Sequence, residues 1–232
     1  MTFMDHLVEL RSRVMKSVLA VGVGTIIALF GWRQILEILA QPYFAAVDGE
    51  ELNFFQVTEA FSLALRIGLF GGLVLASPVV IYQLWRFVAP ALTERERRHV
   101  VPLSAVMSLL FVGGVAAGYF ALPLTLNLLL GFGDELLQPT IGADFYLRFA
   151  MRFLFAFGVA FLFPVFLFAA AAIGVVTSER LRHWRPWAVT VIIVVAAFLT
   201  PGGDPLTLLL LTGPMYVLYE LTILAIRFIL KR

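Results

Sequence analysis

The chain has 232 residues, of which 61% are hydrophobic and only 14% are charged, whereas a soluble domain carries about 25% charged residues. This composition excludes an ordinary soluble domain and indicates an integral membrane protein, and a net charge of +2 is too small to indicate a nucleic-acid surface. With no cysteine, the chain has no disulfide, no thiolate nucleophile and no cysteine-ligated metal. We therefore expect lipid and other proteins as partners, and no nucleic acid.

The N-terminal stretch at 5–13, DHLVELRSR, places acids and arginines together in front of the first apolar run. A cleavable signal peptide is one interpretation, because a basic stretch before an apolar run also describes such a segment. Asp5 and Glu9 argue against it, and the run ends at Trp32 without a small-residue cleavage motif. We expect a retained span with a helical cytoplasmic lead-in.

Charged residues divide the chain into six apolar segments, which predict an all-α membrane protein with six transmembrane helices. The expected spans are 14–32, 64–86, 99–122, 149–174, 187–201 and 206–227, in a single transmembrane domain over residues 1–232. Glycines let helices approach closely and prolines bend them, so we expect a curved, concave bundle. The apolar stretch at 99–133 exceeds one span of about 20 residues. Its helix is therefore expected to give way to an extracytoplasmic extension near Gly118 and Pro123.

The fifth and sixth helices are expected to be short. Only the residues at 187–200 precede the turn TPGGDP, and at about 1.5 Å each they cover about 21 Å of a hydrocarbon core of about 30 Å. Such a mismatch thins the bilayer locally or tilts neighbouring helices. Alternatively, Arg185 and Asp204 mark the ends of these helices only roughly.

The distribution of lysine and arginine predicts the orientation, because cytoplasmic loops carry an excess of both. With a cytoplasmic N-terminus, thirteen of these residues lie on the cytoplasmic side and four, Arg33, Arg66, Arg148 and Arg152, on the other. Both termini are therefore expected in the cytoplasm. The last three of these arginines are interpreted as snorkelling anchors near the outer ends of their helices.

Two cytoplasmic carboxylates differ from their neighbours in how their own chain neutralises them. In the loop TERERRHV at 93–100, Glu94 faces Arg98 at i+4, whereas Glu96 has no arginine at i±3 or i±4. Glu96 is thus either a solvated carboxylate near a helix N-terminus or a binding group.

Glu9 has Arg13 at i+4. An exposed pair of this kind contributes only about 0.3–0.5 kcal/mol, so an incoming guanidinium could displace Arg13. Together with Glu96, Glu9 would form a receptor for a cationic peptide.

The remaining polar residues give little sign of chemistry. Glu220 is the acid expected inside the membrane, as a functional group or as a carboxylate hydrogen-bonded between helices. The histidines at 6, 99 and 183 lack the spacing of a metal site, so neither a metal nor a cofactor is expected. No nucleophile elbow or phosphate-binding loop is found, and we expect no enzymatic activity.

Four stretches together resemble one family: HLVELRSRV at 6–14, the block from LASPVV to RHVVPL at 75–103, FGVAFLFPV at 157–165 and PMYVLYE at 214–220. They are similar to TatC, the multi-spanning core subunit of the twin-arginine protein translocase. The similarity runs from residue 3 to about residue 228.

The resemblance implies a receptor for signal peptides with two adjacent arginines. It also implies single-span TatA- and TatB-like partners, self-association, and passage of folded proteins driven by the proton motive force. In that family, a glutamate of the N-terminal E-L-R motif and one in the first cytoplasmic loop read the arginine pair, and these match Glu9 and Glu96. Other matching positions are Arg11, Phe87 and Pro90 near the peptide, Pro42 in the first extracytoplasmic loop, Tyr119, and Asp204. Thr200 and Thr207 resemble a polar patch that docks the single-span partners.

One position departs from the family. Members often have a glutamate in the fourth helix before its proline, where this chain has Leu162. A carboxylate role in the middle of the membrane is therefore not carried over.

Two other classes compete with the receptor. A small-solute or ion secondary transporter would have charges at the midplane on broken helices, but here the charges gather at the ends of the spans. An intramembrane enzyme would need a buried serine, histidine or aspartate pair. The expected location is a bacterial or archaeal cytoplasmic membrane, with a plastid or other organellar membrane as the alternative.

Overall fold

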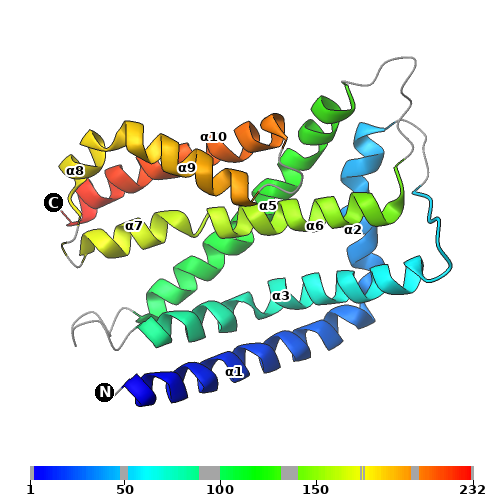
Figure 1. Cartoon of the computed structure of the whole chain (residues 1–232), viewed down its shortest axis with the longest axis horizontal. Helices are drawn as coiled ribbons and strands as arrows, with labels where there is room; N and C mark the ends of the chain where they lie inside the picture. The colour runs from blue at the N-terminus through cyan, green and yellow to red at the C-terminus, as the bar shows by residue number, and fades with distance from the viewer. Residues whose placement is uncertain are drawn as a thin grey trace. The chain divides into compact units, whose positions relative to one another are not determined.

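The computed structural model describes residues 3–47, 52–88, 100–131, 141–172, 174, 176–199 and 204–230. Within these residues the chain is helical, and its only β-type pairing is an isolated bridge between Asn53 and Gly142 (Figure 1). The helices are α1 Phe3–Phe30, α2 Trp32–Ala46, α3 Glu59–Val88, α5 Val100–Leu130, α6 Ala143–Ala160, α7 Phe163–Ala172, α8 Ser178–His183, α9 Arg185–Leu199 and α10 Pro205–Ala225, which continues as a π-helix over Ile226–Leu230. Five stretches of helix are long and apolar enough to cross a membrane, and α9 is a shorter apolar helix. The predicted all-α fold of apolar, membrane-length helices is thus confirmed.

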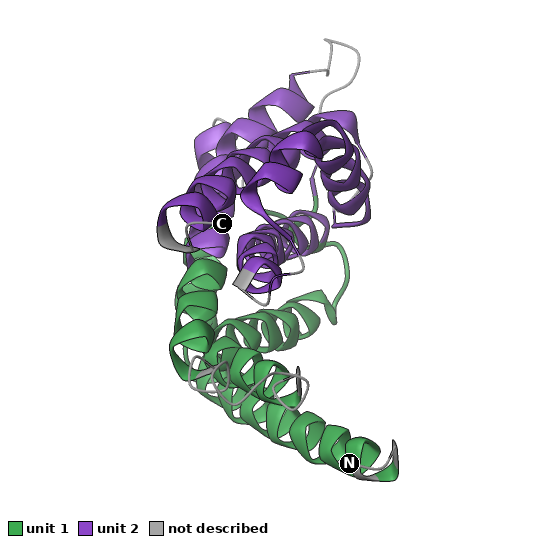
Figure 2. Ribbon diagram, turned by 90° about the vertical axis from the view of Figure 1, so that its left-hand side faces the viewer, with its two compact units in different colours: residues 1–41, 52–112, 142–144 green, residues 42–51, 113–141, 145–232 purple. Residues whose placement is uncertain are grey.

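The described chain falls into two compact units (Figure 2). Unit 1 contains Met1–Gln41, Leu52–Val112 and Gly142–Asp144, and unit 2 contains Pro42–Glu51, Gly113–Ile141 and Phe145–Arg232. Helices α2 and α5 each contribute to both units. The curved, concave arrangement of the whole bundle stays a prediction.

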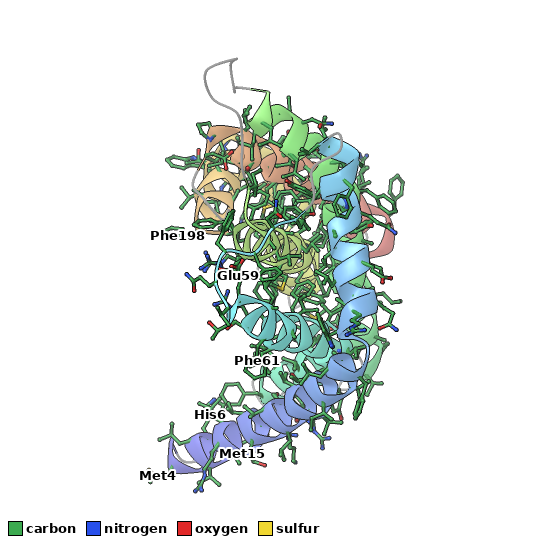
Figure 3. The ribbon with its side chains drawn as sticks, turned by 90° about the vertical axis from the view of Figure 1, so that its right-hand side faces the viewer. Met4, His6, Met15, Glu59, Phe61 and Phe198 are labelled. Carbon is green, nitrogen blue, oxygen red and sulfur yellow. The ribbon has the colours of Figure 1, made fainter. Side chains whose placement is uncertain are left out.

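In unit 1, α1 packs along α3 with their backbones in direct contact. A Cβ atom on Gly24 would lie 2.6 Å from the carbonyl oxygen of Gly72, and one on Gly72 would lie 2.4 Å from the backbone nitrogen of Thr25. Only residues without a side chain fit at this crossing, as in other close helix pairs of membrane proteins. The outer face of α1 carries exposed apolar side chains, among them Met4 and Met15 (Figure 3).

Helix α2 was not expected from the sequence. Its residues WRQILEILAQPYFAA include Pro42, for which an extracytoplasmic loop was expected, whereas the structure puts Pro42 inside the helix and buries it. A proline in a helix removes one backbone hydrogen bond. In unit 2, the neighbouring Tyr43 is fully buried and its ring lies 5.0 Å from that of Tyr146. Packing therefore holds the helix at this position.

Helix α5 also differs from the expectation. It continues through Gly118 and Pro123 to Leu130 instead of giving way to an irregular extension. A Cβ atom on Gly118 would lie 3.0 Å from the side chain of Phe157 on α6. Gly118 is thus a packing residue in unit 2, and the expectation that the helix ends near it was wrong.

The fourth span is divided into α6 and α7, with turn residues Phe161 and Leu162 between them. Pro164 follows the break and has no N–H group to offer the carbonyl four residues before it. The chain turns there with a tighter bond, from the Leu162 N–H to the Val159 carbonyl oxygen at 3.0 Å. The single helix expected over 149–174 is therefore two helices in line.

The expectation of two short helices holds only for α9. This helix has 15 residues, which at about 1.5 Å each cover about 22 Å. The last span, by contrast, runs over 24 residues from Pro205 to Phe228, so the sixth helix is not short. Glu220 forms an ion pair with Arg185 within this span, and the helix continues past it.

Candidate functional site

The candidate site lies where the first turns of α1 face the last turns of α3 in unit 1. His6, Glu9 and Arg13 are three and four residues apart on α1, and Gln83 and Phe87 are four apart on α3. Residues at these spacings share one face of a helix. We call these five residues the α1–α3 site.

Arg13 connects the two helices. Its Nη2 lies 3.0 Å from Glu9 Oε1, and its Nη1 donates to Gln83 Oε1 at 3.1 Å. The expected i,i+4 pair of Glu9 and Arg13 is thus confirmed. The pair is not a surface pair, however, because the side chains of Arg13 and Glu9 are only 16% and 19% exposed. The small energy of an exposed pair therefore underestimates its strength, since burial strengthens the attraction between charges.

The ion pair is incomplete on both sides. Glu9 Oε2 and Arg13 Nε are buried and have no hydrogen-bond partner among the described residues. A guanidinium and a carboxylate can form two parallel hydrogen bonds, but here they form one, because Gln83 takes another N–H of the same guanidinium. Glu9 thus has one carboxylate oxygen with spare capacity for a donor.

An aromatic pair flanks the carboxylate. The rings of His6 and Phe87 are stacked, with centroids 4.4 Å apart and 22° between their planes. The structure therefore brings Phe87 to the same helix pair as Glu9, which lies between the His6 and Arg13 contacts along α1. His6 was not a site candidate, although its position three residues before Glu9 gives it the same helical face; Figure 3 marks it near the start of α1.

Other predicted site residues are not among the five residues of the α1–α3 site. Arg11 is an exposed residue of α1, and Tyr119 lies on α5 with its ring against that of Phe120. Glu96, Pro90 and Thr200 lie outside the described residues.

Asp204 is the N-cap of α10. Its Oδ1 accepts from the backbone N–H of Thr207 at 2.7 Å, and its Oδ2 accepts from the Thr207 hydroxyl at 2.7 Å. Thr207 is fully buried, so its hydroxyl is used inside unit 2 and is not offered to a docking helix. Both residues thus stabilise the start of the last helix.

Glu220 is held from two sides in unit 2. Its Oε2 accepts from Arg185 Nη2 at 2.7 Å, and its Oε1 accepts from the Tyr216 hydroxyl at 3.1 Å. The hydroxyl of the adjacent Tyr219 donates to the Leu181 carbonyl oxygen at 2.7 Å. Glu220 thus fulfils the expectation of a carboxylate hydrogen-bonded between helices, because it ties α9 to α10.

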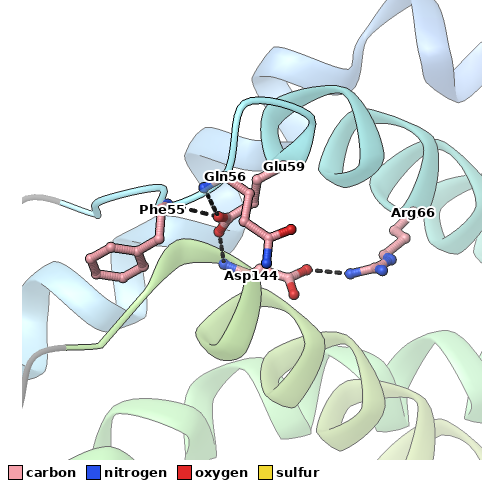
Figure 4. Close-up of polar contacts among 5 residues, drawn as sticks. All are labelled: Phe55, Gln56, Glu59, Arg66 and Asp144. Atoms are coloured by element: carbon pink, nitrogen blue, oxygen red, sulfur yellow. Dashed lines mark hydrogen bonds and ion pairs between the residues drawn. The ribbon is translucent and has the colours of Figure 1, made fainter.

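A second carboxylate cluster, which sequence reasoning missed, lies in unit 1 at the start of α3 (Figure 4). Glu59 Oε2 accepts from the backbone N–H groups of Phe55 and Gln56 at 2.8 and 3.1 Å, and Oε1 accepts from that of Asp144 at 3.1 Å. Asp144 in turn pairs with Arg66, which was expected to be a snorkelling anchor. We call these residues the Glu59 clamp. The spacing of Gln56 and Glu59, as in a capping box, was the available signal.

The fold and these sites define a multi-pass helical membrane protein. The family model of "Sec-independent protein translocase protein (TatC)" matches residues 5–214. Proteins of that name from Carboxydothermus hydrogenoformans and Aquifex aeolicus are 37% and 36% identical, over 99% and 96% of this chain and 94% and 93% of their own lengths. A crystal structure of the twin-arginine translocase receptor TatC in the detergent DDM is 36% identical, with a TM-score of 0.82, and covers 95% of this chain and 99% of its own.

The chain therefore belongs to the TatC family. It is a core subunit of the twin-arginine translocase, a multi-pass protein of the bacterial inner membrane that works in a complex with other Tat components. The small-solute or ion transporter considered above is not favoured.

Proposed function

We propose that this chain is the receptor that binds signal peptides with two adjacent arginines at the cytoplasmic face of the membrane. The observation that carries this proposal is the buried Oε2 of Glu9, which has no hydrogen-bond partner among the described residues. A buried acceptor left without a donor costs about 1–3 kcal/mol. A guanidinium that reaches this oxygen recovers that cost.

Paired carboxylates can prefer arginine to lysine. The planar guanidinium offers two parallel donors, whereas the ammonium of lysine is a compact, strongly hydrated charge. Glu9 binds one arginine of the pair, and Glu96, which follows α3 in the sequence, binds the other. Arg11 and Pro90 lie near the same peptide.

Most of the affinity comes from apolar contacts. Two charged hydrogen bonds contribute at most about 6 kcal/mol at about 1.5–3 kcal/mol each, which is less than the roughly 8 kcal/mol of a micromolar complex. The apolar segment of the signal peptide supplies the remainder, with Phe87 at the start of its docking surface.

The receptor acts without enzymatic chemistry. Single-span TatA- and TatB-like proteins join it, several copies associate, and folded cargo crosses the membrane at the expense of the proton motive force. Both termini lie in the cytoplasm, which agrees with the excess of lysine and arginine on that side.

The test measures binding of a synthetic signal peptide with an Arg-Arg pair, and of the same peptide with Lys-Lys, to the purified chain in detergent. We expect the Arg-Arg peptide to bind more tightly, and Glu96→Ala to weaken its binding at least tenfold. Glu94→Ala is the matched control, because Glu94 has arginines at i+3 and i+4, and its effect is expected to be small. Equal losses in the two variants, or equal binding of both peptides to the unaltered chain, would refute the proposal.

A further inference from the structure

Glu9 is already paired with a guanidinium of its own chain, that of Arg13. Arg13 holds Glu9 Oε1 through Nη2 at 3.0 Å, and the two side chains are largely buried. An arginine of a peptide therefore meets a carboxylate whose charge is largely neutralised. Binding has to proceed by exchange or by addition beside Arg13.

The geometry favours exchange. Arg13 forms one hydrogen bond to Glu9, and within the described part of the chain no donor reaches Oε2 and no acceptor reaches Arg13 Nε. A guanidinium from outside the chain is not tethered at i+4, so it can approach both oxygens and form two parallel bonds. The exchange thus replaces one charged hydrogen bond with two. Addition would instead place two guanidinium groups against one carboxylate, and like charges repel.

Gln83 lowers the cost of releasing Arg13. Its Oε1 accepts from Arg13 Nη1 at 3.1 Å, through an N–H group that Glu9 does not use. When Arg13 leaves Glu9, this bond to α3 can remain, so the displaced guanidinium keeps a partner in the protein. The α1–α3 site therefore contains both Arg13, which pairs with Glu9, and Gln83, which can hold Arg13 after it leaves Glu9.

We propose that Arg13 is an internal occupant of the receptor carboxylate, released to Gln83 when a peptide arginine takes its place. The inference rests on the proposed function, because it assumes that Glu9 binds the peptide. An internal occupant lowers the apparent affinity for every ligand of Glu9 by the same factor, which is the fraction of molecules in which Glu9 is available. Arg13 thus sets the affinity threshold of the site but not its preference for arginine over lysine.

The experiment compares Arg13→Gln with the unaltered chain, using the synthetic Arg-Arg and Lys-Lys signal peptides and the full chain in detergent. Glutamine keeps a neutral hydrogen-bond donor near Glu9 but removes the competing charge. We expect both peptides to bind about three- to tenfold more tightly, because a charge-assisted hydrogen bond to Glu9 is replaced by a weaker neutral one. The ratio of the two dissociation constants is expected to stay unchanged.

Two further variants accompany this comparison. Lys16→Gln removes a charge from an exposed residue of the same helix and is expected to change binding less than twofold, because exposed charges are screened. Arg13→Lys is the second test if Arg13→Gln does not fold. An ammonium lacks the planar fork that holds Glu9 and Gln83 together, so we expect a smaller gain in the same direction.

The outcomes separate this inference from the proposed function. If Glu9→Gln abolishes peptide binding but Arg13→Gln weakens it or changes the ratio, Arg13 positions Glu9 or selects the ligand, and the inference is overturned while the receptor stands. If Glu9→Gln leaves binding intact, the assignment of Glu9 as a receptor group fails first.

Discussion

The backbone contact between α1 and α3 gives the sharpest prediction about stability. A methyl group on Gly72 would lie 2.4 Å from the backbone nitrogen and 2.5 Å from the Cα atom of Thr25, and one on Gly24 would lie 2.6 Å from the Gly72 carbonyl oxygen. Non-bonded heavy atoms pack best at about 3.5–4.0 Å. Gly72→Ala or Gly24→Ala therefore has to push the helices apart by about 1 Å or more, because backbone atoms cannot rotate away as a side chain would.

The magnitude follows from two opposing terms. Replacing glycine by alanine within a helix favours folding by about 1 kcal/mol, whereas forcing extra atoms into a packed contact costs about 1–3 kcal/mol, occasionally more. Gly22 provides the matched control, since it lies on α1 two residues before Gly24 and a Cβ atom there would meet nothing within 4 Å. Gly22→Ala shows the helical gain alone, so Gly24→Ala should be less stable than Gly22→Ala by about 1–3 kcal/mol.

Thermal unfolding of the purified variants in one detergent measures this difference. At about 2–4 °C per kcal/mol for a chain of this size, we expect Gly24→Ala and Gly72→Ala to unfold about 2–12 °C below Gly22→Ala. Binding of the Arg-Arg peptide should fall with them, because the same helix pair aligns Arg13 with Gln83. If all three variants unfold at the same temperature, the close contact does not hold these helices together.

Three further predictions concern other helix ends. Glu59→Gln should lower the free energy of unfolding by about 1.5–3 kcal/mol, because the Glu59 clamp loses charge-assisted bonds to backbone N–H groups. The control Glu37→Gln, at an exposed acid of α2, should change it by no more than about 0.5 kcal/mol. Chemical unfolding measures both variants, and similar losses would mean that the clamp does not stabilise the fold. Asp204→Ala should lower the free energy of unfolding by about 0.5–2 kcal/mol through loss of the N-cap. Asp204→Asn keeps an acceptor for the Thr207 N–H and should be nearly as stable as the unaltered chain. If the Asn variant is as unstable as the Ala variant, the charge of Asp204 stabilises the helix and the cap does not. Lengthening α9 by about five leucines should impair transport of a folded cargo in membrane vesicles without impairing peptide binding, because it removes about 8 Å of mismatch with the hydrocarbon core; normal transport would argue against a role for local thinning.

The number and order of the spans could be predicted from the sequence because hydropathy depends on composition alone. The ends of the helices were harder to predict than their number. Pro42 and Pro123 were interpreted as marks of irregular chain, but both lie inside helices, where packing of neighbouring residues outweighs the missing hydrogen bond. The partner of Glu220 could not be predicted either, since Arg185 is 35 residues away and no local pattern reveals the pair.

The candidate site was partly predictable. The i,i+4 spacing of Glu9 and Arg13 correctly predicted their pairing, because that contact is local. Their burial and the bond to Gln83 depend on how α3 packs against α1, and Gln83 is 70 residues from Arg13. The Glu59 clamp was missed because it joins a loop, α3 and the start of α6, which only the folded chain brings together.

The break between α6 and α7 gives the fourth span a property that a continuous helix lacks. Helices α6 and α7 meet at Phe161 and Leu162, and Pro164 lacks the N–H group for the backbone hydrogen bond that would make this junction more rigid. A hinge of this kind can bend without breaking the hydrogen bonds of either helix. When the surrounding bilayer thins or a neighbouring chain presses against this span, the angle between α6 and α7 can change at the hinge while both helices stay intact.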